Sequence, residues 1–395
     1  MNLNSTMPGQ SNRIHVVDAF RGFAVMAIFL VHNIEHFISG IYPDAASQPG
    51  WLNNLDKGVF TVVFSLFAGK SYAIFALLFG FTFSILFAKQ QSLGKDFGYR
   101  FLWRLLLLTV FASLNALFFP GGDVLLLYSI AGLVLFFVRK FDNKTLLVLA
   151  VLCLLQPIEW YHYLRSLLDP GFTLPLKQAG ALYGEIGKVV ASGDIWEFFK
   201  VNVTTGQKAS LLWAIEGGRF MQTMGLFMCG LWIGRKQLFL DSKESRGFWL
   251  SALIASAILF APLYELKVIL MDNNTDVVSK STVGVAMDMW SKFSFTVVLT
   301  ASFMLLYQKL KFRNLTASLI PYGRMSLTNY VSQSILGALI YFPFGLSLAK
   351  SCGMTMSLLI GIVVFLAQVQ FCKWWLSKHK QGPLEGLWAR ATWFK

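Results

Sequence analysis

Charged residues are scarce in this chain: Asp, Glu, Lys and Arg make up 14% of its 395 residues, whereas 55% are hydrophobic. A typical soluble domain carries about 25% charged residues. This shortage excludes an ordinary soluble protein of two or three domains. Because a chain in lipid must satisfy its backbone hydrogen bonds internally, we expect an all-α, polytopic membrane bundle that forms a single domain over residues 1–395.

Motifs that mark metal, nucleotide and hydrolase sites are also absent. The four cysteines form no CxxC pair and no His/Cys spacing fits a zinc site, so we expect no metal and interpret the thiols as packing residues. No glycine-rich loop of Walker or Rossmann spacing, no GxSxG and no HExxH occurs. ATP-driven transport and serine hydrolysis therefore have no support in the sequence, and we expect no permanently bound cofactor.

Acidic residues are fewer than basic ones, 20 against 34, which gives a net charge of +14. A basic excess of this size can indicate a nucleic-acid partner. Here the basic residues cluster in short segments between apolar runs, as the topology of membrane proteins predicts. We therefore expect membrane lipid as a partner and no nucleic acid.

Ten apolar segments are long enough to cross a bilayer as helices. Lys and Arg favour alternate connections between them, which predicts cytoplasmic tails at 1–14 and 377–395 and an extracytoplasmic loop with amphipathic helices at 166–210. The apolar stretch 58–68 is expected to form a short interfacial or re-entrant helix. The ten segments are 15–39, 71–89, 100–119, 123–139, 144–165, 216–234, 247–268, 289–308, 325–345 and 354–376.

The first segment carries ionisable residues at membrane depth, where such groups are costly and usually mark a function. Ten residues separate Arg21 from His32, so both lie on one helix face with a rise of about 16 Å between them. We predict that His32 is a general base oriented by Glu35 or His36; the alternative is a buried histidine that hydrogen-bonds another helix. The Arg21 guanidinium suits a phosphate or carboxylate group, or it pairs with Asp18.

Further polar residues are candidates for an acceptor pocket or its support. His36 lies near the surface, so its side chain is expected to extend to the membrane interface. Lys70 would either hold an anionic group or extend to the interface in the same way. Asp123 directly follows two glycines at the start of an apolar segment, which is typical of a helix N-cap. The whole set is Asn33, Glu35, His36, Lys70, Asp123, Arg219 and Asn329.

Two of the polar pairs have a structural interpretation. Glu216 and Arg219 are three residues apart, so on a helix they would form an ion pair with each other. Asn329 and Gln333 are four residues apart within an apolar segment, so they would join neighbouring helices by hydrogen bonds.

Several stretches, in this order along the chain, resemble the YeiB-like bacterial membrane proteins, a family of unknown function. They are VVDAFRGFAVMAIFLVHN at 16–33, KSYAIFALLFGFTFSI at 70–85, GDVLLLYSIAGLVLFF at 122–137, GRFMQTMGLFMCGLWIGR at 218–235, PYGRMSLTNYVSQSIL at 321–336 and GPLEGLWARATW at 382–393. That family resembles a broader superfamily of transmembrane acyltransferases. Many of its surface-polymer enzymes carry Arg or Lys, ten residues and then His in the first span, and Arg21 and His32 match that spacing.

The resemblance implies a multi-pass protein of the bacterial plasma (inner) membrane that acts as an acyl-CoA-dependent O-acyltransferase. Arg21 would bind the donor from the cytoplasm, and His32 would deprotonate a hydroxyl group of a cell-envelope glycan or lipid. Lys70, Asp123 and Arg219 would shape the acceptor pocket or stabilise the developing oxyanion. Two alternatives are a transporter or exporter of a small or lipid-linked solute and a non-catalytic membrane scaffold.

Overall fold

The computed structural model describes residues 14–121, 123–169, 171–272 and 276–394. Within these ranges every regular element is a helix, so the all-α prediction is confirmed. The longer helices are α1 (His15–Ile34), α2 (Gly50–Phe67), α3 (Ser71–Ser92), α4 (Gly98–Ala116), α5 (Val124–Ala131), α6 (Leu133–Val138), α7 (Asn143–Leu154), α8 (Pro157–Leu168), α9 (Ala179–Ser192), α10 (Ile195–Val201), α11 (Gln207–Glu216), α12 (Arg219–Arg235), α13 (Lys243–Lys267), α14 (Val277–Ser281), α15 (Val283–Tyr307), α16 (Leu310–Leu315), α17 (Leu319–Arg324), α18 (Ser326–Tyr341), α19 (Met354–Lys378) and α20 (Pro383–Trp393).

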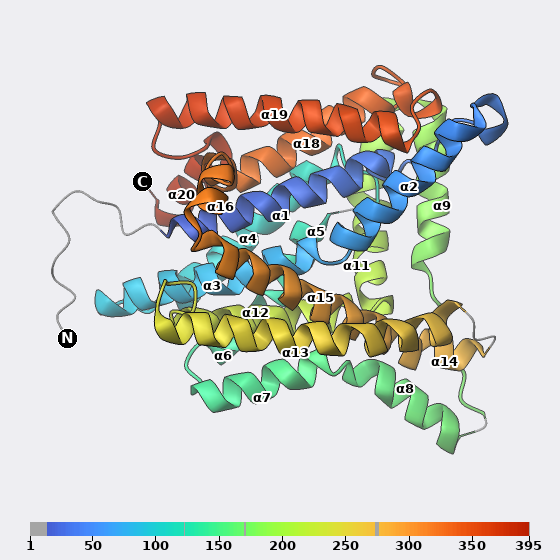
Figure 1. Ribbon diagram of the computed structural model, residues 1–395. Helices are drawn as coiled ribbons and strands as arrows, with labels where there is room; N and C mark the ends of the chain where they lie inside the picture. Colours follow the sequence, from blue (N-terminus) through green and yellow to red (C-terminus); the bar gives the residue numbers. More distant parts are fainter. Residues whose placement is uncertain (1–13, 122, 170, 273–275, 395) are drawn as a thin grey trace.

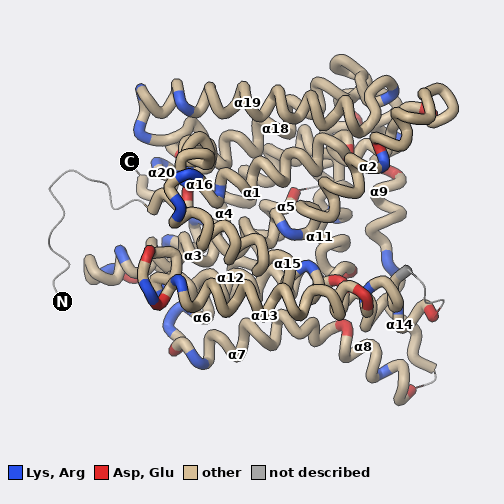
Figure 2. The backbone as a smooth tube through the Cα atoms, in the orientation of Figure 1, with Lys and Arg blue, Asp and Glu red and all other residues tan. Residues whose placement is uncertain are grey.

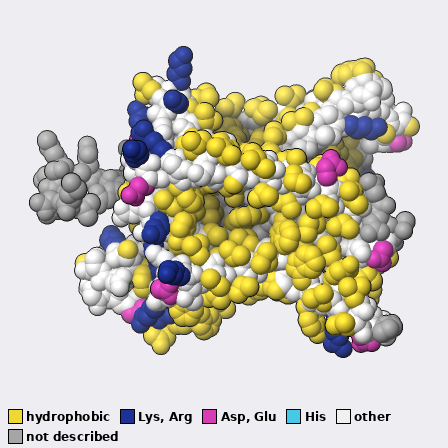
Figure 3. Space-filling model, turned by 60° about the horizontal axis from the view of Figure 1, so that its bottom comes forward, with side chains coloured by type: hydrophobic (Ala, Val, Ile, Leu, Met, Phe, Trp, Pro, Cys, Tyr) yellow, Lys and Arg dark blue, Asp and Glu magenta, His cyan; other side chains and the backbone are white. Residues whose placement is uncertain are grey.

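The long helices run roughly side by side between the two ends of the molecule (Figure 1). Both chain termini lie at one end, and α9 crosses the opposite end. Charged residues lie mainly towards these two ends, with Lys and Arg prominent at the end that holds the termini (Figure 2). A broad apolar surface separates the charged rims (Figure 3), which is the distribution expected of a protein surrounded by lipid.

Five helical stretches among the described residues are long and apolar enough to cross a membrane, and the bent pair α7–α8 adds a sixth when it is counted as one span. The chain is thus compatible with a multi-pass membrane protein. The ten-span topology and the sidedness of the termini stay predictions. The five stretches are His15–Ile34, Gly50–Ser92, Lys243–Met271, Val277–Tyr307 and Met354–Lys378.

All ten predicted segments are helical, but three are not single straight helices. The first ends at Ile34 and continues as a 3₁₀ turn over His36–Ile38, whose three residues have positive φ angles. The fourth is divided into α5 and α6 at Gly132. The fifth bends by 53° between α7 and α8, because Pro157 has no backbone N–H and the preceding Gln156 adopts φ 61°.

Helix α1 occupies the middle of the bundle and positions the first group of candidate residues. It packs against α3, α17, α18 and α19. Gly22 on α1 and Gly323 on α17 have no room for a side chain, so the two backbones meet directly. Gly80 and Gly230 produce the same close approach between α3 and α12. These glycine contacts hold α1 and α3 at fixed positions around the cavity described below.

Candidate functional site

Arg21 lies in the second turn of α1 and faces α3. Its guanidinium donates to Oδ1 of Asp18 at 3.2 Å and to Oγ1 of Thr82 at 3.0 Å. The predicted alternative of an Asp18–Arg21 pair is therefore present. The same side chain also lines a cavity, so pairing and ligand binding do not exclude each other at this residue.

The cavity has a volume of about 410 Å³ and lies between α1, α3, α4, α5, α18 and α20. Three arginines line it: Arg21 in the second turn of α1, Arg104 in the second turn of α4 and Arg324 at the end of α17. Its remaining wall is mostly aromatic and aliphatic and includes Tyr128 of α5 and Tyr330 of α18, both of which are buried. A cavity that combines cationic and apolar walls suits an elongated ligand with an anionic portion and an apolar portion.

The C-terminal helix α20 forms part of the cavity wall through Glu385, Trp388 and Trp393. The Glu385 carboxylate accepts hydrogen bonds from the backbone N–H groups of Leu327 and Thr328 at 2.7 and 3.1 Å, and from the Thr328 hydroxyl at 2.6 Å. It thereby caps the N-terminus of α18. The Arg104 guanidinium lies 4.3 Å from the ring centre of Trp388. Helix α20 is therefore attached to both α4 and α18.

Asp123 is buried and directly precedes Val124 and Leu125, which line this cavity. Its Oδ1 accepts from the backbone N–H of Leu125 at 2.9 Å, so the predicted N-cap is confirmed. The same oxygen accepts from the Tyr330 hydroxyl at 2.9 Å, and this contact joins α5 to α18. Tyr128, one turn further along α5, donates to the backbone carbonyl of Tyr72 on α3.

His32 lies on α1 four residues beyond Ile28, which lines the cavity. Four residues of helix correspond to a rise of about 6 Å. The imidazole lies 3.6 Å from Oε2 of Glu35 and meets the Phe119 ring edge-on at a centroid distance of 4.8 Å. It is not among the lining residues of this cavity. About a fifth of the side chain is exposed, so the ring has access to the surroundings.

His36 is fully buried, and the expectation that its side chain extends to the interface is wrong. One ring nitrogen lies 2.6 Å from Oγ of Ser357, the other lies 2.9 Å from the carbonyl of Ile41, and the ring stacks on Tyr341. The reason is the end of α1 at Ile34: the left-handed turn that follows directs the imidazole back towards α18 and α19. Buried Asn33 donates to the carbonyl of Ser357, so it too supports the packing of α1 against α19.

Lys70 begins α3 and is only 9% exposed. Its Nζ donates to the carbonyl of Ser65 at 2.9 Å and lies 5.5 Å from the centre of the Phe295 ring. Lys292 on α15 packs against Gly69, the residue before Lys70. The contact is so close that a Cβ atom on Gly69 would lie 2.8 Å from Cδ of Lys292. Lys292 forms a 2.5 Å ion pair with Asp288. The predicted interfacial position of Lys70 is thus replaced by a buried cluster of charges.

Glu216 and Arg219 are both described, and no ion pair joins them, so their predicted pairing is wrong. The Glu216 carboxylate accepts from the backbone N–H groups of Gln178 and Ala179 at 2.7 and 3.3 Å and caps α9. The Arg219 guanidinium lies 3.7 Å from the ring centre of Trp213. The turn at 217–218 separates the two residues into α11 and α12, because Gly218 adopts φ 70° and interrupts the helix.

The prediction for Asn329 and Gln333 is confirmed. Asn329 donates to the carbonyl of Tyr322 at 2.9 Å, and Gln333 donates to the Tyr322 hydroxyl at 2.6 Å. Gln333 also donates to Oε1 of Gln368 at 3.2 Å. These bonds join α17, α18 and α19 and place Asn329 in the support of the bundle rather than in the cavity wall.

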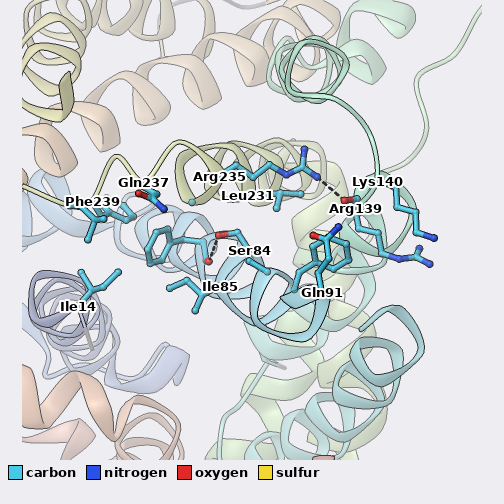
Figure 4. A pocket seen from close by; sticks show the side chains of 15 residues that line it. Ile14, Ser84, Ile85, Gln91, Arg139, Lys140, Leu231, Arg235, Gln237 and Phe239 are labelled. Atoms are coloured by element: carbon cyan, nitrogen blue, oxygen red, sulfur yellow. Dashed lines mark hydrogen bonds between the residues drawn. The ribbon is translucent and has the colours of Figure 1, made fainter. Parts of the chain in front are cut away.

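A second cavity of about 670 Å³ lies between α3, α12 and the end of α6 (Figure 4). Ser84, Gln91, Arg139 and Arg235 are among the residues that line it. The Arg235 guanidinium donates to the carbonyls of Arg139 and Phe141 at 2.7 Å each, so it completes the C-terminus of α6. In the part of the chain that the structure describes, no group of three or more His, Cys, Asp or Glu side chains is arranged to hold a metal ion.

Comparison with known proteins relates the chain to proteins without an assigned activity. Residues 233–395 match a family model described as a protein of unknown function, DUF418. The uncharacterized protein YxaH of Bacillus subtilis is 28% identical over 99% of this chain and 97% of its own length. The uncharacterized protein YeiB of Escherichia coli is 25% identical over 95% of both chains. The predicted resemblance to YeiB-like proteins is confirmed.

A third relative without an assigned activity also matches nearly the whole chain. An uncharacterized 39.9 kDa protein from the amylase 3' region of Bacillus acidopullulyticus is 24% identical over 96% of this chain and 94% of its own length. No solved structure matches the chain significantly. The region matched by DUF418 contains Lys292 and two residues that line the arginine-lined cavity, Tyr330 and Glu385, whereas Arg21 and His32 lie outside it.

Several residues of the site were not identified from the sequence. Arg104 and Tyr330 lie within apolar segments, and only the cavity distinguishes them from packing residues. Asp288 and Lys292 had a detectable signal, because an acid and a base four residues apart in an apolar segment form a helical pair. Trp388 lies in the stretch GPLEGLWARATW, where the aromatic side chain alone indicates only an interfacial position.

Proposed function

We propose that this chain is an integral membrane O-acyltransferase that transfers an acyl group from acyl-CoA to a hydroxyl group of a cell-envelope glycan or lipid. In this proposal the chain crosses the bacterial inner membrane ten times, with both termini in the cytoplasm. The distribution of Lys and Arg towards the end that holds the termini supports this orientation (Figure 2).

The cavity that contains Arg21 is the observation that carries the proposal. Acyl-CoA combines phosphate groups with a long pantetheine arm and an acyl chain. The phosphates would bind at the cytoplasmic end to Arg21, Arg104 and Arg324. A guanidinium group suits this role because it can donate two parallel hydrogen bonds to phosphate oxygens. The aromatic and aliphatic wall beyond them suits the thioester arm, which extends towards the level of Tyr330.

His32 is the proposed general base. Its imidazole accepts the proton of the acceptor hydroxyl, and the resulting oxygen attacks the thioester carbonyl. The new C–O bond forms an ester, the C–S bond breaks, and CoA leaves as a thiol after taking up the proton. Glu35, 3.6 Å from the imidazole, orients the ring and stabilises its protonated form during transfer.

One turn of α1 separates the cavity from His32, and the Phe119 ring contacts the imidazole. The proposal therefore requires the thioester to pass beyond Ile28 to reach the base. Phe119 lies between the end of α4 and the turn that precedes α5.

The test is an assay of the purified full-length protein with radiolabelled acetyl-CoA and a cell-envelope extract as acceptor. We expect label to enter the extract and free CoA to be released. His32→Ala should lower the rate at least about 100-fold, because a positioned general base contributes roughly 10²–10⁴-fold. His162→Ala on α8 is the matched control and should keep the wild-type rate.

Two outcomes would contradict the proposal. CoA release by His32→Ala at the wild-type rate would remove the histidine from the mechanism. No release above a protein-free background, with bound acetyl-CoA also undetectable, would remove the donor and leave the transporter and scaffold alternatives.

A further inference from the structure

Three cations lie where α3 contacts α12 and α15: Lys70 at the N-cap of α3, Lys292 on α15 and Arg219 at the start of α12. The side chain of Lys292 packs against Gly69, next to Lys70. Gly218, which precedes Arg219, packs against Met289 on α15, and the carbonyl of Met289 accepts a hydrogen bond from Gln222 of α12 at 2.9 Å. We refer to Lys70, Lys292, Arg219 and Asp288 as the Lys70 cluster.

The Lys70 cluster contains more positive than negative charge. Asp288 pairs with Lys292 at 2.5 Å and is the carboxylate that acts on both lysines among the described residues. Lys70 contacts the carbonyl of Ser65 and the ring of Phe295, and Arg219 stacks on Trp213. The buried Nε of Arg219 has no hydrogen-bond partner among the described residues. Like charges repel strongly where water is scarce, so an anion bound among these cations would stabilise them.

The helix N-termini in this region add further partial positive charge to the cluster. Lys70 is the N-cap residue of α3, and Arg219 is the first residue of α12. Helix N-termini carry partial positive charge and favour anions, so a lysine and an arginine at two such ends are unfavourably placed on their own. A bound anion reverses the sign of these interactions, because it attracts both the side chains and the exposed N–H groups.

We propose that the Lys70 cluster binds a phosphate or pyrophosphate group. This inference rests on the proposed acyltransferase function. If the cluster holds the acceptor, the acceptor is a phosphate-bearing compound whose hydroxyl group is acylated. Glu35 and Arg219 both lie within electrostatic range of Tyr183 on α9, so the His32–Glu35 pair and the cluster lie towards the same end of the bundle. The phosphate belongs either to a lipid headgroup or to a free soluble compound.

Binding is measured on the full-length protein in phosphatidylcholine nanodiscs, without acyl-CoA. One arm titrates inorganic pyrophosphate, and the other compares nanodiscs with and without phosphatidic acid. Tryptophan fluorescence reports the melting temperature, since the chain has 12 Trp, and calorimetry gives the dissociation constant. We expect saturable binding that Lys70→Met and Arg219→Met each weaken about tenfold, as loss of a charge-assisted hydrogen bond predicts.

Two control variants make the result specific. Lys70→Arg keeps the charge and should keep most of the binding, which separates charge loss from misfolding. Lys200→Met removes a cation from exposed α10 and should bind like the wild type. Binding in the pyrophosphate arm identifies a soluble source, and binding only with phosphatidic acid identifies a lipid source; both support the site.

The proposal is overturned if neither probe binds the wild type saturably, or if Lys200→Met weakens binding as much as Lys70→Met. Absence of acyl transfer in a protein that still binds pyrophosphate would contradict the enzymatic function and leave the anion site intact. Acyl transfer to a phosphate-free acceptor at a rate unaffected by Arg219→Met would contradict the assignment of the acceptor alone.

Discussion

The Tyr330 hydroxyl donates a 2.9 Å hydrogen bond to Oδ1 of Asp123, a residue 207 positions earlier in the chain. Both side chains are buried. The contact joins the start of α5 to the second turn of α18, and Tyr330 lines the arginine-lined cavity. It therefore couples the first half of the chain to the region matched by the DUF418 family.

Tyr330→Phe should destabilise the protein by about 1–3 kcal/mol, because it removes a hydrogen bond to a buried carboxyl group without changing the volume of the ring. The measurement is the denaturation midpoint in a fixed detergent. Tyr99→Phe changes a hydroxyl on an exposed side chain and should have no effect. An equal loss in both variants would show that the Tyr330–Asp123 bond is not the cause.

Glu385→Ala should release α20 from α18. The substitution removes the acceptor of three hydrogen bonds to Leu327 and Thr328, and loss of a helix cap costs about 0.5–2 kcal/mol. Limited proteolysis of the full-length protein should then remove the C-terminal tail several times faster. Glu244→Ala, in the first turn of exposed α13, is the control; unchanged proteolysis of Glu385→Ala would contradict the docking role of the carboxylate.

Arg21→Ala should weaken the binding of CoA about 10- to 150-fold, since one charge-assisted contact to phosphate contributes roughly 1.5–3 kcal/mol. Equilibrium titration of the purified protein with CoA measures this directly and needs no acceptor. Arg313→Ala on α16 removes an exposed arginine that does not line the cavity and should leave binding unchanged. Equal affinity in Arg21→Ala and the wild type would exclude Arg21 from the donor site.

Asp288→Asn should destabilise the protein more than the double variant Asp288→Asn with Lys292→Met. The single change leaves Lys292 without its carboxylate. Removing one partner of a fully buried ion pair costs about 3–5 kcal/mol of stability. The cost is smaller here because both side chains are partly exposed. Replacing both residues removes the unpaired charge. A double-mutant cycle of melting temperatures checks the order, and additive losses would contradict coupling between the two side chains.

Features that depend on neighbouring residues were predicted correctly. The apolar segments form helices, Asp123 caps the helix that it precedes, and Asn329 joins neighbouring helices. His36 and Glu216 were predicted incorrectly because their partners are distant in sequence. His36 contacts Ser357 on α19, and Glu216 caps α9 from 38 residues away.

By itself, the sequence determined that this protein is helical and membrane-compatible, because composition and apolar segment length decide those properties locally. It also placed Arg21 and His32 on one face of α1, since the helical repeat requires it. Only the tertiary structure assembled the cavity around Arg21 and brought Lys70 beside Lys292. These arrangements depend on how six or more helices pack, and no local pattern specifies which side chains meet between them.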